Sequence, residues 1–439
     1  MKRWKYLFKI ALLSGMIALT SVQICPAADA ASTAAESTAS VSTNEIPGWP
    51  TGPEITSETG VLIDAETGTV LYSKGGDDIR YPASITKIMT LLLAVENCSL
   101  KEDVVFTETG TRDISWDSGN IGMQVGEVMS MRACLYALVI RSANEVAAQI
   151  AEHVGGTEQN FIEMMNQRAA EIGCTNTHFA NASGLPDQNH YSTAHDMALI
   201  MREGLKNKKF RRIIGTTDYT IKPTNMNSES RVLHTHHPLL APESGYYYDG
   251  CIGGKTGYTS EAGNTLVTAV ERNGITYIAV TMKASDLSIS SADSTALFNY
   301  GYQNFTKLQV NGGEIIAPAG VTVDDLTVQE TQENNETTDS YYYGDHLLGS
   351  VTVLEVTPTP EPAAVSENTS GTAATDEDGN QTVQNDDTQS EAENDVRETQ
   401  TFAGRLQLRE VLLLIGAAMI LLLLILCIAL ARKERRYSR

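Results

Sequence analysis

The stretch 81–95, YPASITKIMTLLLAV, begins with a tyrosine and a proline and continues as a largely apolar run. Its apolar side chains recur at intervals of three and four, at Ile85, Ile88, Met89, Leu92 and Val95. That spacing predicts a helix with one buried face, and a proline is typical of a helix start. We therefore expect Ser84 in the first turn of a helix that packs into the core.

Lys87 follows Ser84 by three residues, so the two side chains share one face of the predicted helix. A desolvated lysine beside another cation can lose its proton and then take one from a serine hydroxyl, which activates the serine as a nucleophile. Ser-x-x-Lys occurs once in the chain. Taken alone, the pair is more often a capping serine followed by a surface lysine, so other motifs must decide.

Two further short motifs follow. Ser142-Ala143-Asn144 lies in a break between helical patterns at 131–140 and 146–154. Lys255-Thr256-Gly257 precedes a strand-rich segment. A lysine and a threonine on a strand edge offer a positive charge and a hydroxyl to a substrate carboxylate, and the glycine leaves room for a peptide backbone.

The remaining pattern predicts a mixed body. Residues 60–64 and 69–73 are short apolar runs with the spacing of a β-hairpin, and residues 266–271 and 275–282 flank an Arg-Asn-Gly turn. Residues 284–305 end in a helical pattern. The predicted fold class is α+β, with a helical middle between two sheet-forming ends.

The three motifs, in this order, resemble those of the penicillin-recognising serine enzymes. The resemblance is closest to the low-molecular-weight penicillin-binding proteins that are serine-type D-alanyl-D-alanine carboxypeptidases (peptidase family S11), and it covers roughly residues 55–305. It implies an antiparallel sheet flanked by helices, with a cleft between a helical part and the sheet edge that bears Lys255. It also implies acylation by β-lactam antibiotics.

On this resemblance, Ser84 attacks the carbonyl of a D-Ala-D-Ala bond in a peptidoglycan stem peptide and Lys87 takes its proton. Ser142 and Lys255 then relay a proton to the leaving D-alanine, and the backbone amides of Ser84 and Tyr258 form the oxyanion hole. Water hydrolyses the acyl-enzyme, and no cofactor is required. The substrate-binding residues implied by the resemblance are Asn144, Lys255, Thr256, Gly257 and Tyr258.

Two features depart from the family pattern. Ala143 and Glu145 stand where the family often has glycine and aspartate. Residues 284–297 lack the arginine that commonly helps to bind the terminal carboxylate, and Lys283 just before them is the nearest basic residue. A non-catalytic penicillin-binding or sensing module therefore stays open as an alternative. A class A β-lactamase is disfavoured because no Glu-x-x-Leu-Asn stretch lies between residues 145 and 254.

The two ends of the chain indicate export and membrane anchoring. A basic start followed by an apolar run and small residues is the pattern of a signal peptide, and residues 411–431 are uncharged over a length that can cross a bilayer core of about 30 Å. The expected order is a signal peptide (1–30), a flexible lead-in (31–53), a DD-peptidase catalytic domain (54–305), a small β-rich region (306–356), an acidic disordered tether (357–404), a transmembrane helix (411–431) and a basic cytoplasmic tail (432–439). Basic flanks stay in the cytoplasm, so we expect a single-pass protein of the cell membrane with its catalytic domain on the extracytoplasmic side.

The distribution of charge argues against nucleic-acid binding, and the cysteine content leaves the disulfide state open. Residues 324–398 hold 19 Asp or Glu and one Arg, which accounts for −18 of the net charge of −22, and no basic groove for nucleic acid is evident. No metal-binding motif is present. Four cysteines outside the signal and the span could form disulfides or remain free, and the sequence does not decide between the two: Cys98, Cys134, Cys174 and Cys251.

Overall fold

The computed structural model describes residues 41–353 except 113, 115–117 and 334–335. The predicted signal peptide, tether, transmembrane helix and basic tail lie outside the described residues. No helix within the described part is both long and apolar enough to cross a membrane.

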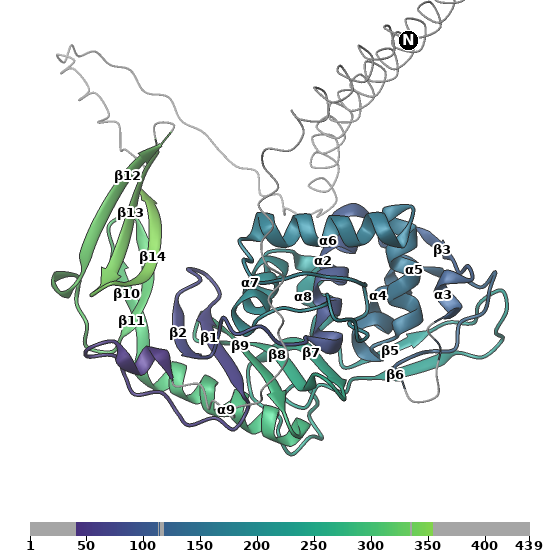
Figure 1. Cartoon of the computed structure of the whole chain (residues 1–439), viewed down its shortest axis with the longest axis horizontal. Helices are drawn as coiled ribbons and strands as arrows, with labels where there is room; N and C mark the ends of the chain where they lie inside the picture. The colour runs from purple at the N-terminus through teal and green to yellow at the C-terminus, as the bar shows by residue number, and fades with distance from the viewer. Residues whose placement is uncertain (1–40, 113, 115–117, 334–335, 354–439) are drawn as a thin grey trace, which may run out of the picture. The chain divides into compact units, whose positions relative to one another are not determined.

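A five-stranded antiparallel sheet forms the centre of the body (Figure 1). Its strands, in spatial order, are β2 (Val70–Lys74), β1 (Thr59–Asp64), β9 (Ile275–Ala284), β8 (Gly263–Arg272) and β7 (Cys251–Thr259). Both predicted hairpins are present. The turn between β8 and β9 places Asn273 and Gly274 at φ values of 52° and 72°, which is the left-handed backbone that an Asn-Gly turn provides.

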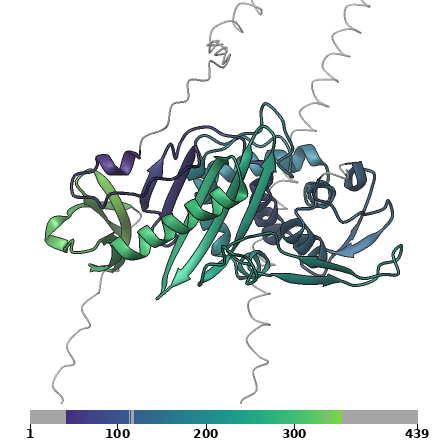
Figure 2. The same ribbon diagram turned by 90° about the horizontal axis from the view of Figure 1, so that it is seen from below.

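Alternate residues of the sheet contribute to two different cores. Val61 and Val280 face a cluster formed mainly by helices, whereas Leu62 and Ala279 face a cluster that contains Leu297. Leu297 belongs to α9 (Leu287–Asn304), which crosses one face of the sheet in Figure 2. The sheet is thus covered on both faces, because side chains alternate along each strand.

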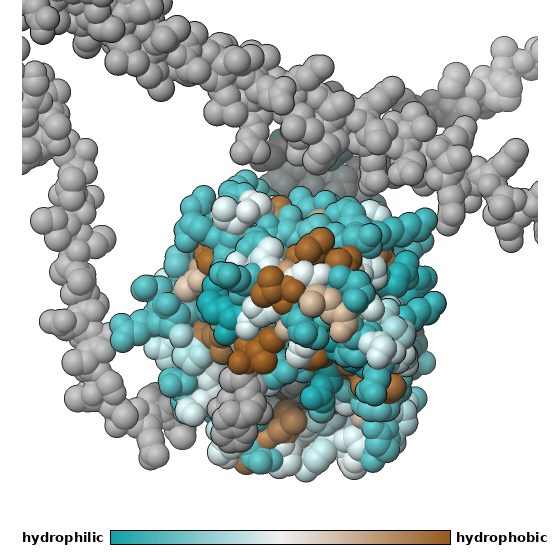
Figure 3. Space-filling view, turned by 90° about the vertical axis from the view of Figure 1, so that its right-hand side faces the viewer, coloured by the Kyte–Doolittle hydropathy of each residue, from teal (hydrophilic) through white to brown (hydrophobic). Residues whose placement is uncertain are grey.

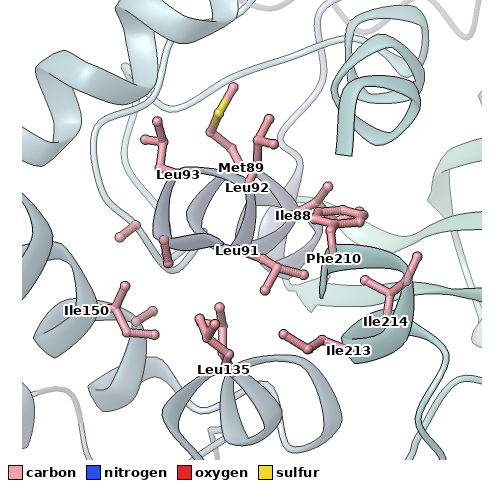
Figure 4. Packing of buried hydrophobic residues seen from close by; sticks show 14 of the residues in the cluster. Ile88, Met89, Leu91, Leu92, Leu93, Leu135, Ile150, Phe210, Ile213 and Ile214 are labelled. Carbon is pink, nitrogen blue, oxygen red and sulfur yellow. The ribbon is translucent and has the colours of Figure 1, made fainter. Parts of the chain in front are cut away.

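The helices on the other face are grouped around α2 (Lys87–Asn97). They are α4 (Met131–Ile140), α5 (Asn144–Gly155), α6 (Glu158–Ile172), α7 (Ala194–Leu205) and α8 (Lys208–Ile214). Every residue of α2 from Lys87 to Val95 is buried, so the prediction of one buried face is wrong. Figure 4 shows the reason: Leu91 points toward Leu135 of α4, while Leu92 and Leu93 point to the opposite side.

Shorter elements complete this half. They are α3 (Thr109–Arg112), the strand pair β3 (Asp103–Val105) and β4 (Val128–Ser130), and the strand pair β5 (Asp218–Ile221) and β6 (Arg231–His234). Figure 3 views this side and shows apolar side chains exposed in small groups among hydrophilic ones. Val105, Val125 and Val232 are each more than half exposed. Isolated exposed apolar residues are ordinary on a protein surface, so this face does not by itself identify a site.

The region after residue 304 consists of strands. β10 (Phe305–Val310) pairs with β11 (Gly313–Pro318), and after a short 3₁₀ turn, η3 (Val323–Asp325), a three-stranded antiparallel sheet follows: β12 (Thr327–Glu333), β13 (Glu336–Tyr343) and β14 (His346–Val353). The sequence predicted a small β-rich region at this place.

The predicted flexible lead-in differs from the structure over residues 41–53. Ser42–Glu45 forms a 3₁₀ turn, η1, and Trp49 is 6% exposed. The indole Nε1 of Trp49 donates a hydrogen bond to Leu71 O at 3.0 Å, and its ring packs against Phe305 and His346. A composition rich in Ser, Thr and Ala indicated flexibility, but one large aromatic residue is enough to dock this segment.

Candidate active site

Ser84 lies in the short 3₁₀ turn η2 (Ala83–Thr86), immediately before α2. Two glycines allow other segments to approach this turn closely. A Cβ on Gly184 would lie 1.9 Å from Ala83 O, and a Cβ on Gly257 would lie 2.8 Å from Ser84 N. Since real Cβ atoms do not approach that closely, only glycine fits at either position. The turn that contains Ser84 is therefore held between the loop at residue 184 and strand β7.

Lys87 is fully buried, and its Nζ contacts three oxygen atoms. It donates hydrogen bonds to Ser84 Oγ at 2.9 Å, Asn144 Oδ1 at 2.7 Å and Ser183 O at 2.6 Å. These acceptors can take all three protons of an ammonium group, which allows it to be buried. The predicted pair of Ser84 and Lys87 is thus joined directly, and Asn144 belongs to the same network.

The Ser183 carbonyl was not predicted from the sequence. It is presented by a loop that folds around the side chain of Asn181, whose Oδ1 accepts hydrogen bonds from Ser183 N at 3.1 Å and Gly184 N at 2.7 Å. The stretch FANASGL at 179–185 carried the only signal, an asparagine two residues before a Ser-Gly pair, which is typical of a turn.

Ser142 lies in the break between α4 and α5 with φ at 56°, a left-handed conformation that is costly for a residue with a Cβ. Its neighbour Asn144 donates its backbone N–H to Gly119 O at 2.8 Å. Both Ser142 and Asn144 line the same cleft as Ser84. Strained backbone of this kind is concentrated at functional sites, where surrounding contacts maintain it.

Glu145 is one of the two departures from the family pattern. Its carboxylate is fully buried, and Oε1 accepts the backbone N–H of Ile121 at 2.6 Å. Burial raises the pKa of this carboxyl, and the backbone hydrogen bond of Ile121 acts in the opposite direction. Glu145 thus fixes the loop around residues 119–122, which forms one wall beside Ser142, a role that sequence reasoning missed.

Strand β7 provides the opposite wall. Thr256, Gly257 and Tyr258 line the cleft, and the Tyr258 side chain is 64% exposed. Lys255 is only 3% exposed and lies behind this wall, where its Nζ donates to Thr256 O at 2.6 Å. Burial lowers the pKa of the Lys255 ammonium to about 7. The predicted relay between Ser142 and Lys255 is not formed as a direct hydrogen bond in this structure, because Lys255 donates to the Thr256 carbonyl instead.

The cleft between these walls has a volume of about 590 Å³. Its described lining includes Ser84, Ser142, Asn144 and the three β7 residues, but no lysine or arginine. Lys283 does not replace the missing arginine, since its Nζ donates to Glu261 O and the residue lines a separate, smaller hollow. Two other lysines near the cleft, Lys87 and Lys255, are buried behind its surface.

The four cysteines of the described body are free thiols. The pKa of each thiol is raised by burial, to about 12 for Cys98, Cys174 and Cys251. None lines the cleft, so the thiols take no part in this site.

Comparison with known proteins gives a consistent result. Residues 46–286 match the model of a family described as D-alanyl-D-alanine carboxypeptidase. The chain is 31% identical over 251 residues to D-alanyl-D-alanine carboxypeptidase DacF of Bacillus subtilis, a match that covers 57% of this chain and 63% of that protein. It is 31% identical over 261 residues to a D-alanyl-D-alanine carboxypeptidase of Streptomyces sp. strain K15, covering 57% of this chain and 89% of the relative.

The fold is also found among solved structures. The crystal structure of the Streptomyces K15 DD-transpeptidase superimposes with a TM-score of 0.54 at 30% identity, covering 58% of this chain and all of that one. The residues matched by the family model, 46–286, contain all three motifs.

Proposed function

Because the chain belongs to the D-alanyl-D-alanine carboxypeptidase family of serine-type hydrolases, we propose that it removes the terminal D-alanine from peptidoglycan stem pentapeptides through an acyl-enzyme on Ser84. The observation that carries this proposal is the contact between Lys87 Nζ and Ser84 Oγ at 2.9 Å. Lys87 is fully buried at this contact. A buried amine next to a hydroxyl is the arrangement that nucleophilic catalysis by serine requires.

In the first step, Lys87 acts as a neutral amine, its ammonium having released one proton to solvent, and takes the proton of Ser84 as Oγ forms a bond to the carbonyl carbon of the D-Ala-D-Ala peptide. Asn144 and the Ser183 carbonyl hold Nζ in place through hydrogen bonds of 2.7 and 2.6 Å. The two partners reduce the reorganisation that proton transfer needs, because Nζ is already oriented toward Oγ.

The oxyanion of the tetrahedral intermediate would be held by the backbone N–H groups of Ser84 and Tyr258. The close approach of Gly257 to Ser84 N brings these two segments together. Removal of one such donor from a serine hydrolase typically costs about 10²–10³ in rate.

Collapse of the intermediate breaks the peptide C–N bond, and the leaving D-alanine amine needs a proton. The Ser142 hydroxyl lines the cleft and would donate its proton to that amine, while the Lys87 ammonium, which took the proton of Ser84 in the first step, would return a proton to Ser142. Water then attacks the ester of Ser84 and restores the enzyme.

The terminal carboxylate of the substrate would bind against β7. Thr256 offers its hydroxyl at the cleft surface, and Lys255 lies behind it, as an ammonium below its pKa of about 7. A buried cation interacts more strongly with a carboxylate than an exposed one does, because less water screens the pair. β-Lactam antibiotics carry a carboxylate and a reactive amide, so we expect them to acylate Ser84 in the same cleft.

The test of this proposal is release of free D-alanine from a stem pentapeptide that ends in D-Ala-D-Ala. The parent should release one D-alanine per peptide, whereas Ser84→Ala should release none and a pentapeptide ending in L-Ala should not react. If the parent forms a stable penicillin adduct but releases no D-alanine, the alternative of a non-catalytic binding or sensing module is correct. Repeated penicillin hydrolysis without D-alanine release would indicate a β-lactamase.

We also propose that the catalytic body acts outside the cytoplasm on a flexible acidic tether. The support is the sequence of the two ends: a signal-like start, an acidic segment at 357–404, an uncharged run at 411–431 and basic residues after it. In intact cells, a protease added from outside should degrade the body, and the protein should stay with the membrane after carbonate washing. Recovery in the soluble cytoplasmic fraction would contradict this location.

A further inference from the structure

Three side chains of different kinds meet at the end of the helical core that is remote from the cleft. A Cys98 sulfur, a Glu102 carboxylate oxygen and a His153 ring nitrogen all lie within 4.8 Å of one another. His153 Nε2 is 3.2 Å from Glu102 Oε2. Cys98 follows the last residue of α2, Glu102 precedes β3, and His153 lies in the last turn of α5.

The position of this cluster favours a cation. It lies at the C-terminal ends of two helices, α2 and α5, and each helix end carries a partial negative charge from carbonyl groups without a helical partner. Two such ends and a carboxylate therefore produce a negative potential at one point. The position of the helix ends does not depend on which side chains form the cluster, and it also favours the binding of a cation.

A backbone hydrogen bond fixes the orientation of the Glu102 carboxylate. Its Oε1 accepts the backbone N–H of Ser99 at 2.5 Å, which leaves Oε2 directed toward His153. In metal sites, hydrogen bonds from neighbouring groups to the ligand side chains orient those side chains toward the metal.

The donor types select the class of metal. Sulfur and imidazole nitrogen favour a borderline-soft ion such as Zn²⁺ over Mg²⁺ or Ca²⁺, which prefer oxygen ligands. Zinc bonds of about 2.0–2.3 Å place neighbouring donors roughly 3.3–3.8 Å apart in a tetrahedron. Small side-chain adjustments can bring the three atoms from their present spacing to these distances. The Glu102 side chain is 41% exposed, so water can supply the fourth ligand.

We propose that Cys98, Glu102 and His153 form a zinc site with one water ligand, which clamps the C-terminal ends of α2 and α5. The same two helices start with Lys87 and Asn144, which meet in the active site at their opposite ends. The bound ion therefore stabilises the helix pair that supports the active site and takes no part in the reaction. Binding displaces the thiol proton of Cys98, which leaves to solvent as the Zn–S bond forms.

The test uses the full chain, freed of metal by a chelator and then titrated with Zn²⁺ and, as a spectroscopic probe, with Co²⁺. We expect one ion per chain, a thiolate-to-cobalt charge-transfer band in the near ultraviolet, and a higher melting temperature with Zn²⁺. Cys98→Ser and His153→Ala should each weaken binding at least tenfold and abolish the band.

Cys174→Ser is the matched control, because Cys174 is also a half-buried thiol, with its sulfur 3.6 Å from Asp196 O. It should bind both ions as the parent does. A cooperative thermal transition in each apo-protein shows that a variant is folded. The proposal is wrong if the folded parent binds no stoichiometric ion, or if Cys98→Ser and the parent bind it equally. Because no readout depends on peptide cleavage, failure here is distinguishable from failure of the proposed function.

Discussion

At the scale of single residues, the proposed mechanism depends most on Lys87. It has no exposed surface, and its three hydrogen bonds to Ser84, Asn144 and Ser183 fix the position of Nζ. In the proposed mechanism Lys87 is the base, and its Nζ already contacts the Ser84 hydroxyl from which it takes the proton.

Lys87→Met keeps most of the buried volume but removes the base, so we expect the rate of Ser84 acylation by penicillin to fall by about 10²–10⁴. Stopped-flow fluorescence with a labelled penicillin measures this rate. Lys74→Met is the control: Lys74 also donates to backbone carbonyls, those of Ile55 and Ser57, but away from the cleft. Acylation of Lys87→Met within tenfold of the parent rate would remove Lys87 from its assigned role.

Lys255 predicts a pH dependence of stability. Burial lowers its pKa from 10.5 to about 7, so between these values the unfolded chain binds a proton that the folded chain does not. The free energy of unfolding therefore rises with pH across this window, by up to about 1.4 kcal/mol per pH unit from this group. Urea unfolding of the parent and of Lys255→Met from pH 7 to 10 isolates the effect. Parallel curves for the two proteins would show that Lys255 does not titrate as stated.

At the scale of elements, the site depends on how closely β7 approaches the turn before α2. Gly257 makes this approach possible, since a Cβ there would lie 2.8 Å from Ser84 N and 2.4 Å from Thr265 Oγ1. The contact joins the sheet to the helical part, and these two parts form the two walls of the cleft.

Gly257→Ala should push β7 away from the turn and lower the acylation rate at least tenfold, because the two oxyanion-hole donors then separate. Gly245→Ala is the matched control, since a Cβ at Gly245 meets no atom within 4 Å. The same labelled-penicillin assay applies to both. Equal rates in the two variants would show that the close approach has no role in acylation.

The elements that were predicted correctly are those encoded locally. The Asn-Gly turn and the helix at Met131–Ile140 depend on neighbours within a few residues. The role of the Ser183 carbonyl and the meeting of Cys98 with His153 were not predictable, because each depends on segments far apart in the sequence. The full burial of α2 was missed for the same reason: one face packs on helices that its own sequence does not specify.

At the scale of the whole described body, the segment before β1 packs against the β-rich region after residue 304. Trp49 precedes the first strand of the sheet, yet its ring centroid lies 5.2 Å from that of Phe305 and 4.8 Å from that of His346. His346 in turn contacts Val70 O through Nε2 at 2.8 Å. The β-rich end is thus attached to β2 and to the segment before β1.

Trp49→Ala should lower the free energy of unfolding by about 3–5 kcal/mol, the usual cost of removing a large buried aromatic side chain. Acylation of the folded fraction should stay within twofold of the parent, since Trp49 does not line the cleft. Tyr247→Ala, at a side chain 49% exposed, is the control and should change stability by less than about 0.5 kcal/mol. Urea unfolding compares the three proteins, and equal stability of Trp49→Ala and the parent would contradict the docking of this segment.

The most direct test of the central claim is to locate the covalent adduct. After reaction with a labelled penicillin and digestion with trypsin, the label should be found once per chain, on the peptide 81–87 that follows Arg80 and contains Ser84. Ser84→Ala should carry no label. A label on any other residue, or stoichiometric labelling of Ser84→Ala, would contradict the assignment of Ser84 as the nucleophile.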